Sequence, residues 1–240
     1  GRIKYGRTLL KRHAGILDEV SKQYGVQKRF IVALWGIETD FGRITGGFPV
    51  VDALATLAYD GRRSAFFRKE LLLALEILEQ GHIKPKEMQG SWAGAMGQSQ
   101  FMPSSFHRFA VDHDRDGDKD IWGSLPDVFG SIATYLSGSG WRDDLTWGRV
   151  VSIPKGFDRS AIEGETRKTL PEWQALGVRR EDGGDLPTRP VEARIVEVTH
   201  RDGSSRYFAA YENFETILKW NRSTYFAIAV GTLADALGAR

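Results

Sequence analysis

The sequence contains no cysteine among its 240 residues. Disulfide bonds, thiolate metal sites and cysteine nucleophiles are therefore excluded. The sequence also lacks an excess of charge of either sign: it has 33 lysines and arginines and 31 aspartates and glutamates, which gives a net charge of +2. Such a balance gives no broad positive field for a polyanion, so we expect no nucleic-acid partner.

Long hydrophobic runs are absent as well. The longest apolar stretches are residues 30–37 and 225–234, whereas a membrane-spanning helix needs roughly 20 apolar residues. We therefore expect no transmembrane segment. Residues 1–11 show no hydrophobic segment typical of a signal peptide, but the chain opens with Gly rather than Met, so a leader could precede it.

Helical periodicity dominates the first part of the chain. Apolar residues at helical spacing predict helices over residues 8–24, 27–39, 50–59, 62–80, 103–111 and 124–136. Residues 30–37 of the second helix are apolar on every face, which predicts a buried helix. Gly25 is well placed to end the first helix.

The pattern changes after residue 147. Residues 150–154, 193–198 and 205–210 predict strands, the last two forming a hairpin, and a short helix is expected near 171–176. Helices over 212–220 and 223–237 close the chain. We predict a mainly α fold in three parts: an α domain over 1–146 that carries an EF-hand-like loop, a small α+β lobe over 147–211, and C-terminal helices over 212–240 that pack back on the α domain.

An acidic loop gives the sharpest local signal. Positions 1, 3, 5, 7 and 9 of the loop are acidic, and glycine occupies position 6, as in an EF-hand calcium loop; the acids are Asp112, Asp114, Asp116, Asp118 and Asp120. Position 12 is Gly123 rather than the usual glutamate, so a later acid such as Asp127 would have to complete the ligand set. The pattern favours a structural Ca²⁺ over a solvated acidic turn.

Glu38 is a second candidate. It ends an apolar helix beside Trp35, Ile37 and Phe41, and such surroundings would raise its pKa and suit a general acid. Helix ends also reach the surface, where glutamate is simply solvated, and position alone favours that alternative. Asp40 is not a partner carboxylate, because residues two apart on a helix point away from each other.

The glycine-rich segment 90–97 allows close backbone approach to a ligand or to another helix. It lacks the Lys-Ser/Thr ending of a P-loop and the flanking strand of a dinucleotide site, so no nucleotide or other organic cofactor is expected. Ser91 is not surrounded by a G-x-S-x-G motif, which argues against a serine hydrolase.

Taken in order, these segments resemble one family, the MltB-type lytic murein transglycosylases of glycoside hydrolase family 103. The matching stretches are GIETDFGR (36–43), DALATL (52–57), RRSAFF (62–67), GSWAGAMGQSQFMPSS (90–105), DIW (120–122) and WNRS (220–223). The resemblance covers nearly the whole chain. It implies a lysozyme-like α body with a small α+β lobe flanking the active-site cleft, and calcium in the acidic loop.

The resemblance also implies roles for single residues. Glu38 becomes the one catalytic acid/base. Ser91 and Gln100 match positions that contact the N-acetylmuramyl sugar, and cleft positions that hold glycan or peptide are matched by Arg62, Arg63 and Asn221. Where the family usually has tyrosines, this sequence has Phe66, Trp220 and Phe226. These rings can stack on sugars but lack the phenolic hydrogen bond.

The implied reaction needs one carboxyl group. Protonated Glu38 donates to the glycosidic oxygen between N-acetylmuramic acid (MurNAc) and N-acetylglucosamine (GlcNAc) of peptidoglycan, and the substrate's acetamido oxygen stabilises the cationic centre. Ionised Glu38 then deprotonates the muramyl 6-hydroxyl, which closes a 1,6-anhydro ring. Ser91 is expected to orient the acetamido group.

Two other functions stay open at this point: a muramidase that uses water, and a noncatalytic, calcium-stabilised peptidoglycan-binding protein. A calcium sensor is disfavoured because only one loop is present. The substrate implies the periplasm of a Gram-negative bacterium, with a chain that is either soluble or attached to the outer membrane as a lipoprotein. The expected partner is the peptidoglycan glycan strand, bound by a monomer.

Overall fold

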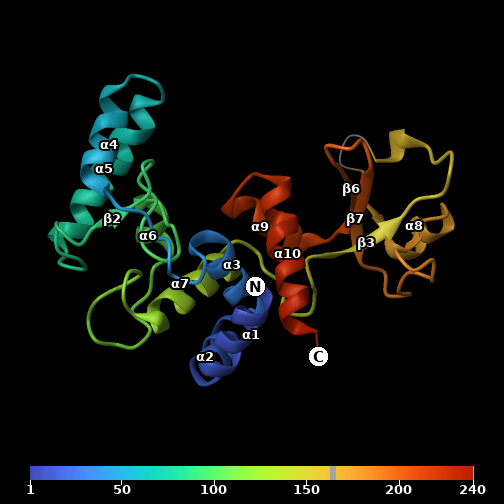
Figure 1. Cartoon of the computed structure of the whole chain (residues 1–240), viewed down its shortest axis with the longest axis horizontal. Helices are drawn as coiled ribbons and strands as arrows, with labels where there is room; N and C mark the ends of the chain where they lie inside the picture. Colours follow the sequence, from blue (N-terminus) through green and yellow to red (C-terminus); the bar gives the residue numbers. More distant parts are fainter. Residues whose placement is uncertain (163–165, 240) are drawn as a thin grey trace. The chain divides into compact units, whose positions relative to one another are not determined.

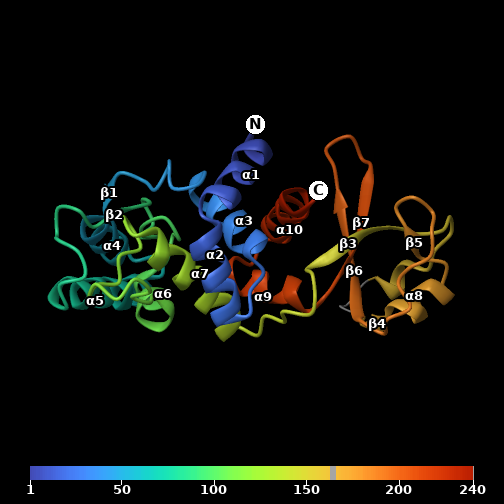
Figure 2. The same cartoon turned by 90° about the horizontal axis from the view of Figure 1, so that it is seen from below.

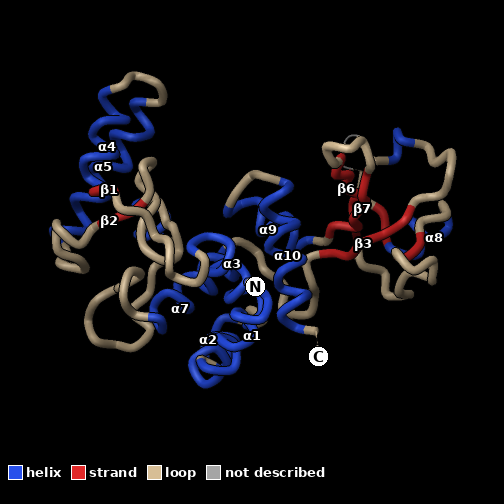
Figure 3. The backbone as a smooth tube through the Cα atoms, viewed as in Figure 1, coloured by secondary structure: helices blue, strands red, loops and turns tan. Residues whose placement is uncertain are grey.

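The computed structural model describes residues 1–162 and 166–239, and these are mainly helical (Figures 1 and 3). They form two compact units, residues 1–139 with 232–240, and residues 140–231. The mainly α fold with a small α+β portion is confirmed. The three-part division at 146 and 211 stays a prediction, and its residues 163–165 and 240 lie outside the described residues.

Seven helices and a two-stranded ribbon build the first unit in the part of it that the structure describes. They are α1 (Arg2–Arg12), α2 (Ala14–Tyr24), α3 (Lys28–Thr39), β1 (Phe48–Pro49), α4 (Val50–Tyr59), α5 (Ser64–Glu79), β2 (Gln89–Gly90), α6 (Pro103–Phe109) and α7 (Leu125–Gly138). The final helix, α10 (Thr224–Gly238), begins in the second unit and ends in the first. Helices α4 and α5 lie side by side as a hairpin (Figures 1 and 2).

Helix α3 is the centre of this unit, as its all-round apolar sequence predicts. All of its residues from Phe30 to Gly36 are buried. The indole ring of Trp35 packs edge-on against Phe129 of α7 at 5.1 Å and against Phe41 at 5.6 Å between ring centroids. Burial of this kind fixes the direction in which the end of α3 emerges from the core.

The prediction of one helix over residues 8–24 is wrong. The structure has two helices that meet at His13, where φ is −105° and ψ is 23°, so the α-helix does not continue through this residue. The His13 ring packs against Trp35 and Phe129 at 6.4 and 6.0 Å, which fixes the break against the core. Helix α2 ends as predicted at Gly25, which is left-handed.

The second unit contains an antiparallel sheet of five strands in the order β4-β6-β7-β3-β5. The strands are β3 (Gly148–Ser152), β4 (Lys168–Thr169), β5 (Arg179–Arg180), β6 (Glu192–Thr199) and β7 (Ser205–Ala210), joined by the short helices η1 (Arg159–Ala161) and α8 (Leu170–Ala175) and followed by α9 (Glu212–Trp220). The predicted hairpin is confirmed, with Thr199 paired to Ser205. Trp173 of α8 lies in the core and donates its indole N–H to Ala193 O at 2.8 Å.

No helix in residues 1–162 and 166–239 has both the length and the apolar character that crossing a bilayer requires.

A buried asparagine ties α9 to the start of the second unit. Asn213 is fully buried. Its Nδ2 donates to Arg142 O and Leu145 O at 2.8 and 3.0 Å, and its Oδ1 accepts from Arg142 N at 2.7 Å.

We expect Asn213→Ala to lower the free energy of unfolding by about 2–4 kcal/mol, because three backbone groups lose their partner. Chemical denaturation of the variant and the wild type measures this. The matched control Asn221→Ala removes an exposed side chain and should cost less than about 1 kcal/mol. Equal costs for the two variants would contradict the role given to Asn213.

Candidate active site

Glu38 is the penultimate residue of α3, half-buried where the helix leaves the core. The helix ends at Asp40, whose φ of 51° is left-handed. Asp40 carries its own cations: its carboxylate accepts from Arg43 at 2.5 Å and from Arg2 at 3.4 Å. The Asp40 carboxylate is therefore neutralised by two arginines.

The end of α3 is held by hydrogen bonds to Gln98, the residue that follows the glycine-rich segment. Trp35 Nε1 donates to Gln98 Oε1 at 2.8 Å, and Gln98 Nε2 donates to Trp122 O at 2.8 Å. Thr39 Oγ1 donates to Gln98 O at 3.0 Å and accepts from Gly42 N at 3.0 Å. The backbone on both sides of Glu38 is thus fixed. Sequence reasoning missed Gln98, because a single polar residue just after a glycine-rich segment shows no periodicity.

Ser91 and Gln100 lie against the loop that follows α3. Gln100 Nε2 donates to Thr45 O at 3.0 Å and to Gly97 O at 2.9 Å. A Cβ on Gly46 would lie 2.1 Å from Gly90 O and 2.8 Å from Ser91 N, so the two backbones are in direct contact. Ser91 Oγ accepts from Ala95 N at 3.1 Å. The fold therefore brings together two segments that the sequence separates, residues 45–46 and residues 90–100.

The predicted cleft residues Arg62, Arg63 and Phe66 lie where α4 turns into α5, and all three are exposed. The Arg63 guanidinium lies 4.5 Å from the centroid of the Phe66 ring and 5.7 Å from that of Phe67. This packing gives the hairpin a cationic and aromatic tip.

A buried acid links this hairpin to the Gln100 segment. Glu70 of α5 is only 2% exposed, and its Oε2 accepts from Ser104 N at 2.9 Å, at the start of α6. Sequence reasoning missed it. The signal was present, since Glu70 shares the buried face of α5 with Ala74 and Ile77 at i, i+4 and i+7 spacing.

The remaining predicted residues belong to the second unit. Asn221 caps the end of α9, is exposed, and accepts from Ser223 N through Oδ1 at 3.1 Å. Trp220 and Phe226 are half-buried. Their placement beside a substrate stays a prediction.

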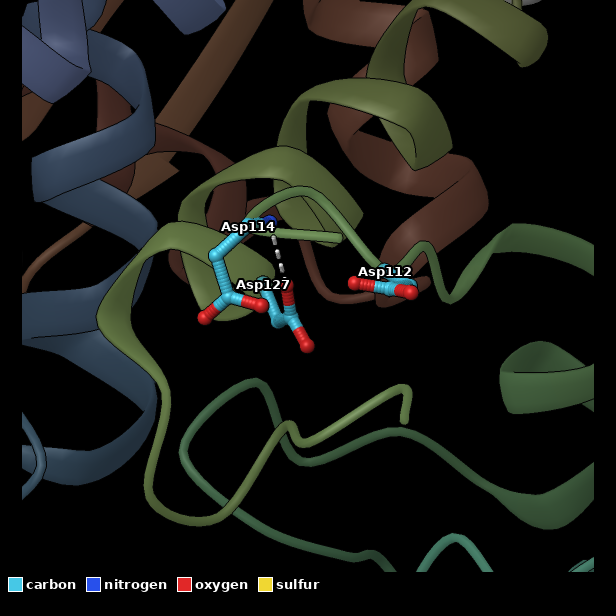
Figure 4. A group of neighbouring side chains, drawn as sticks. All are labelled: Asp112, Asp114 and Asp127. Carbon is cyan, nitrogen blue, oxygen red and sulfur yellow. Dashed lines mark hydrogen bonds between the residues drawn. The ribbon is translucent and has the colours of Figure 1, made fainter. Parts of the chain in front are cut away.

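Three of the six predicted metal ligands gather at one point (Figure 4). Asp112 and Asp114 of the acidic loop and Asp127 of α7 each offer a carboxylate oxygen within 4.8 Å of the others. Asp127 comes from outside the nine-residue acidic motif, as the absence of glutamate at position 12 requires. The other predicted ligands, Asp116, Asp118 and Asp120, are not part of this group.

Backbone groups shape the acidic cluster. Asp127 is fully buried, which raises the pKa of its carboxyl group, while hydrogen bonds from His113 N and Asp120 N lower it. Asp120 accepts instead from Trp122 N and Gly123 N, both at 2.8 Å, and so stabilises the turn. Converging carboxylate oxygens are the ligands that calcium prefers. The residues therefore fit a hard divalent cation.

Gly42, four residues after Glu38, has no room for a side chain. Its φ is +78°, and a Cβ there would lie 2.2 Å from Gln98 Oε1. We expect Gly42→Ala to lower the free energy of unfolding by at least about 3 kcal/mol, through backbone strain and the broken Trp35–Gln98 hydrogen bond.

A matched control separates the two causes. Gly61 also has a positive φ, +87°, but nothing lies within 4 Å of its Cβ position. Gly61→Ala should therefore cost only the backbone term, about 1–2 kcal/mol. Equal destabilisation of both variants in denaturant titrations would show that Gln98 does not hold the end of α3.

The class of protein follows from the comparison with known families and structures. Residues 1–235 match the transglycosylase SLT domain family. The structure superposes on SltB3 from Pseudomonas aeruginosa in complex with NAG-anhNAM-pentapeptide with a TM-score of 0.94 and 45% identity, covering 98% of this chain and 63% of that chain. The fold is thus the lysozyme-like fold of this family, as expected.

The particular family is also shown. The chain is 31% identical over 245 residues to membrane-bound lytic murein transglycosylase B of Escherichia coli K12, covering 98% of this chain and 63% of that protein. The Escherichia coli lytic transglycosylase Slt35 in complex with calcium is 29% identical, with a TM-score of 0.84, and the match covers 98% of this chain and 74% of that one. This chain belongs to the MltB-type lytic transglycosylase family. It spans 63% of the length of the first two relatives.

Proposed function

We propose that this protein is a lytic transglycosylase that cleaves the MurNAc–GlcNAc β-1,4 bond of peptidoglycan and leaves 1,6-anhydro-MurNAc ends. The observation that carries the proposal is the family match over 98% of the chain, with a relative whose structure holds NAG-anhNAM-pentapeptide. An anhydro sugar is the product expected when a substrate hydroxyl, rather than water, attacks the anomeric carbon.

In this proposal Glu38 acts first as acid and then as base. It gives its proton to the glycosidic oxygen and afterwards takes the proton of the muramyl 6-hydroxyl. Glycosidases with two catalytic carboxylates hold them about 5–9.5 Å apart on opposite sides of the bond. Asp40, the nearest acid in sequence, is already paired with Arg43 and Arg2. In the mechanism that the family resemblance implies, the acetamido oxygen of the substrate takes the role of the second carboxylate.

Ser91 and Gln100 are suited to bind the muramyl sugar. The hydrogen bonds from Ala93 N and Ala95 N to Ser91 Oγ are both accepted by the hydroxyl, so its proton can be donated to the acetamido group. Gln100 Nε2 donates to Thr45 O and Gly97 O, so Oε1 is the atom that would accept from a sugar hydroxyl. The family resemblance further implies glycan- or peptide-binding roles for Arg62, Arg63 and Phe66 of the first unit and for Trp220, Asn221 and Phe226 of the second.

Glu38→Gln should lower turnover of purified sacculi by at least about a thousandfold, because an amide can neither give nor take the proton. Mass spectrometry of the soluble products counts the anhydro-muropeptides. Circular dichroism and thermal unfolding check that the variant folds.

The matched control is Asp40→Asn, which removes a carboxylate two residues away at a left-handed position that asparagine tolerates. It should retain cleavage within about threefold, since it loses only exposed ion pairs. Residual turnover by Glu38→Gln comparable to that of Asp40→Asn would refute the role of Glu38.

We also propose that Asp112, Asp114 and Asp127 hold a structural Ca²⁺ and that the protein works as a monomer in the periplasm of a Gram-negative bacterium. The related Slt35 structure in complex with calcium and the convergence of the three carboxylates support the first point. The location of peptidoglycan in the periplasm supports the proposed periplasmic location.

Calcium should raise the unfolding temperature of chelator-treated protein by about 5–10 °C at a hundredfold excess over Kd. Asp127→Asn should lose most of this calcium-dependent shift, because the central carboxylate is gone, whereas exposed Asp185→Asn should keep it. Differential scanning calorimetry with and without calcium measures the shift. If calcium leaves the unfolding temperature of the wild type unchanged, a structural Ca²⁺ is excluded.

A further inference from the structure

Three large apolar side chains stand exposed around Ser91 and the loop that follows Glu38. Ile44 is 67% exposed, Phe48 55% and Trp92 65%. Single exposed apolar residues are ordinary on a protein surface, but these three lie on backbone segments that contact one another, which points to a binding surface. Two of the three are aromatic, and neither has a role in the reaction described above.

The backbone that carries the two aromatic residues is rigid. Phe48 of β1 lies opposite Gly90 of β2, two residues before Trp92, and Pro49 lies opposite Gln89. The close contact of Gly46 with Gly90 and the hydrogen bond from Ser91 N to Ala95 O at 2.8 Å fix both flanks. The two rings are therefore attached to an ordered backbone, so binding a ligand to them costs little free energy for ordering the chain.

The chemistry of these rings selects the ligand. The face of a pyranose ring presents C–H groups, which pack on the electron-rich face of an aromatic ring, while its hydroxyls stay free to hydrogen-bond. Ser91 and Gln100, on the adjoining backbone, offer such hydrogen bonds. A stable protein interface needs about 800 Å² from each partner, far more than two side chains supply. A glycan fits this surface better than a folded protein does.

We propose that Trp92 and Phe48 are substrate-binding residues that stack on pyranose rings of the glycan strand next to Ser91. This assignment rests on the proposed function and adds two contacts to it. Both act on binding, so their loss affects KM and leaves kcat unchanged.

Binding is measured first in the Glu38→Gln background, with a GlcNAc–MurNAc-pentapeptide as the probe in calorimetric titration. Trp92→Ala and Phe48→Ala should each weaken Kd about three- to tenfold. Trp92→Phe keeps an aromatic face and should restore Kd to within about twofold of the parent. An unchanged Kd in either alanine variant would overturn the assignment of that residue.

Kinetics with otherwise wild-type protein then separate stacking from a structural effect. Each alanine variant should raise KM with kcat within about twofold, whereas a disturbed Glu38 would lower kcat. The control Leu72→Ala removes a side chain on α5 that is 55% exposed and should change neither constant.

The outcomes distinguish this inference from the proposed function. Wild type that binds the probe through Trp92 and Phe48 but cleaves no sacculi would refute the transglycosylase activity and retain the stacking residues. Wild type that cleaves sacculi while both alanine variants bind and react normally would refute the stacking residues alone.

Discussion

The hydrogen bond between the indole N–H of Trp35 and Oε1 of Gln98 joins the buried helix α3 to the end of the glycine-rich segment, which Gln98 directly follows. The side-chain Nε2 of Gln98 donates to Trp122 O, next to the acidic loop, and the backbone carbonyl of Gln98 accepts from Thr39 Oγ1. One polar side chain thus sets the distance between the helix that carries Glu38, the segment that carries Ser91 and Gln100, and the loop that holds the acidic cluster. The Gln98 side chain fits beside Gly42 only because Gly42 has no side chain.

This arrangement suits chemistry with a single carboxyl group. A residue that transfers two protons in succession must stay within hydrogen-bond reach of two different oxygens, so its backbone has to be rigid. The buried α3 supplies the rigidity on one side, and the Thr39 and Gln100 hydrogen bonds supply it on the other. The acidic cluster is linked to the same region through hydrogen bonds, since Asp127 accepts from Asp120 N and Asp120 accepts from Trp122 N. A cation held there would therefore contribute stability rather than chemistry.

The sequence predicted the strongly periodic parts of this fold well. Helices 50–59 and 212–220 match α4 and α9 at both ends, because apolar residues recur at helical spacing through both segments. The break at His13 was missed, because it depends on ring contacts with residues far along the chain. The ribbon of β1 and β2 was also missed, since strands of two residues carry no alternation.

The candidate site was only partly predictable from the residues themselves. Acid spacing pointed to the Asp112–Asp114 cluster and, through the unusual Gly123, to Asp127. Position alone favoured a solvated Glu38 with no catalytic role, and only the family resemblance selected it as the acid/base. The contacts that join Thr45, Gly46, Ser91 and Gln100 depend on long-range packing, as does the buried Glu70, so no local pattern shows them.

The central claim is that Glu38 cleaves the glycan without water. Digestion of sacculi in water enriched in oxygen-18, followed by mass spectrometry of the released muropeptides, tests it most directly. The account predicts muramyl ends that carry no label, because the 6-hydroxyl of the same sugar closes the ring. One labelled oxygen for each bond cleaved would show that water is the nucleophile and would contradict it.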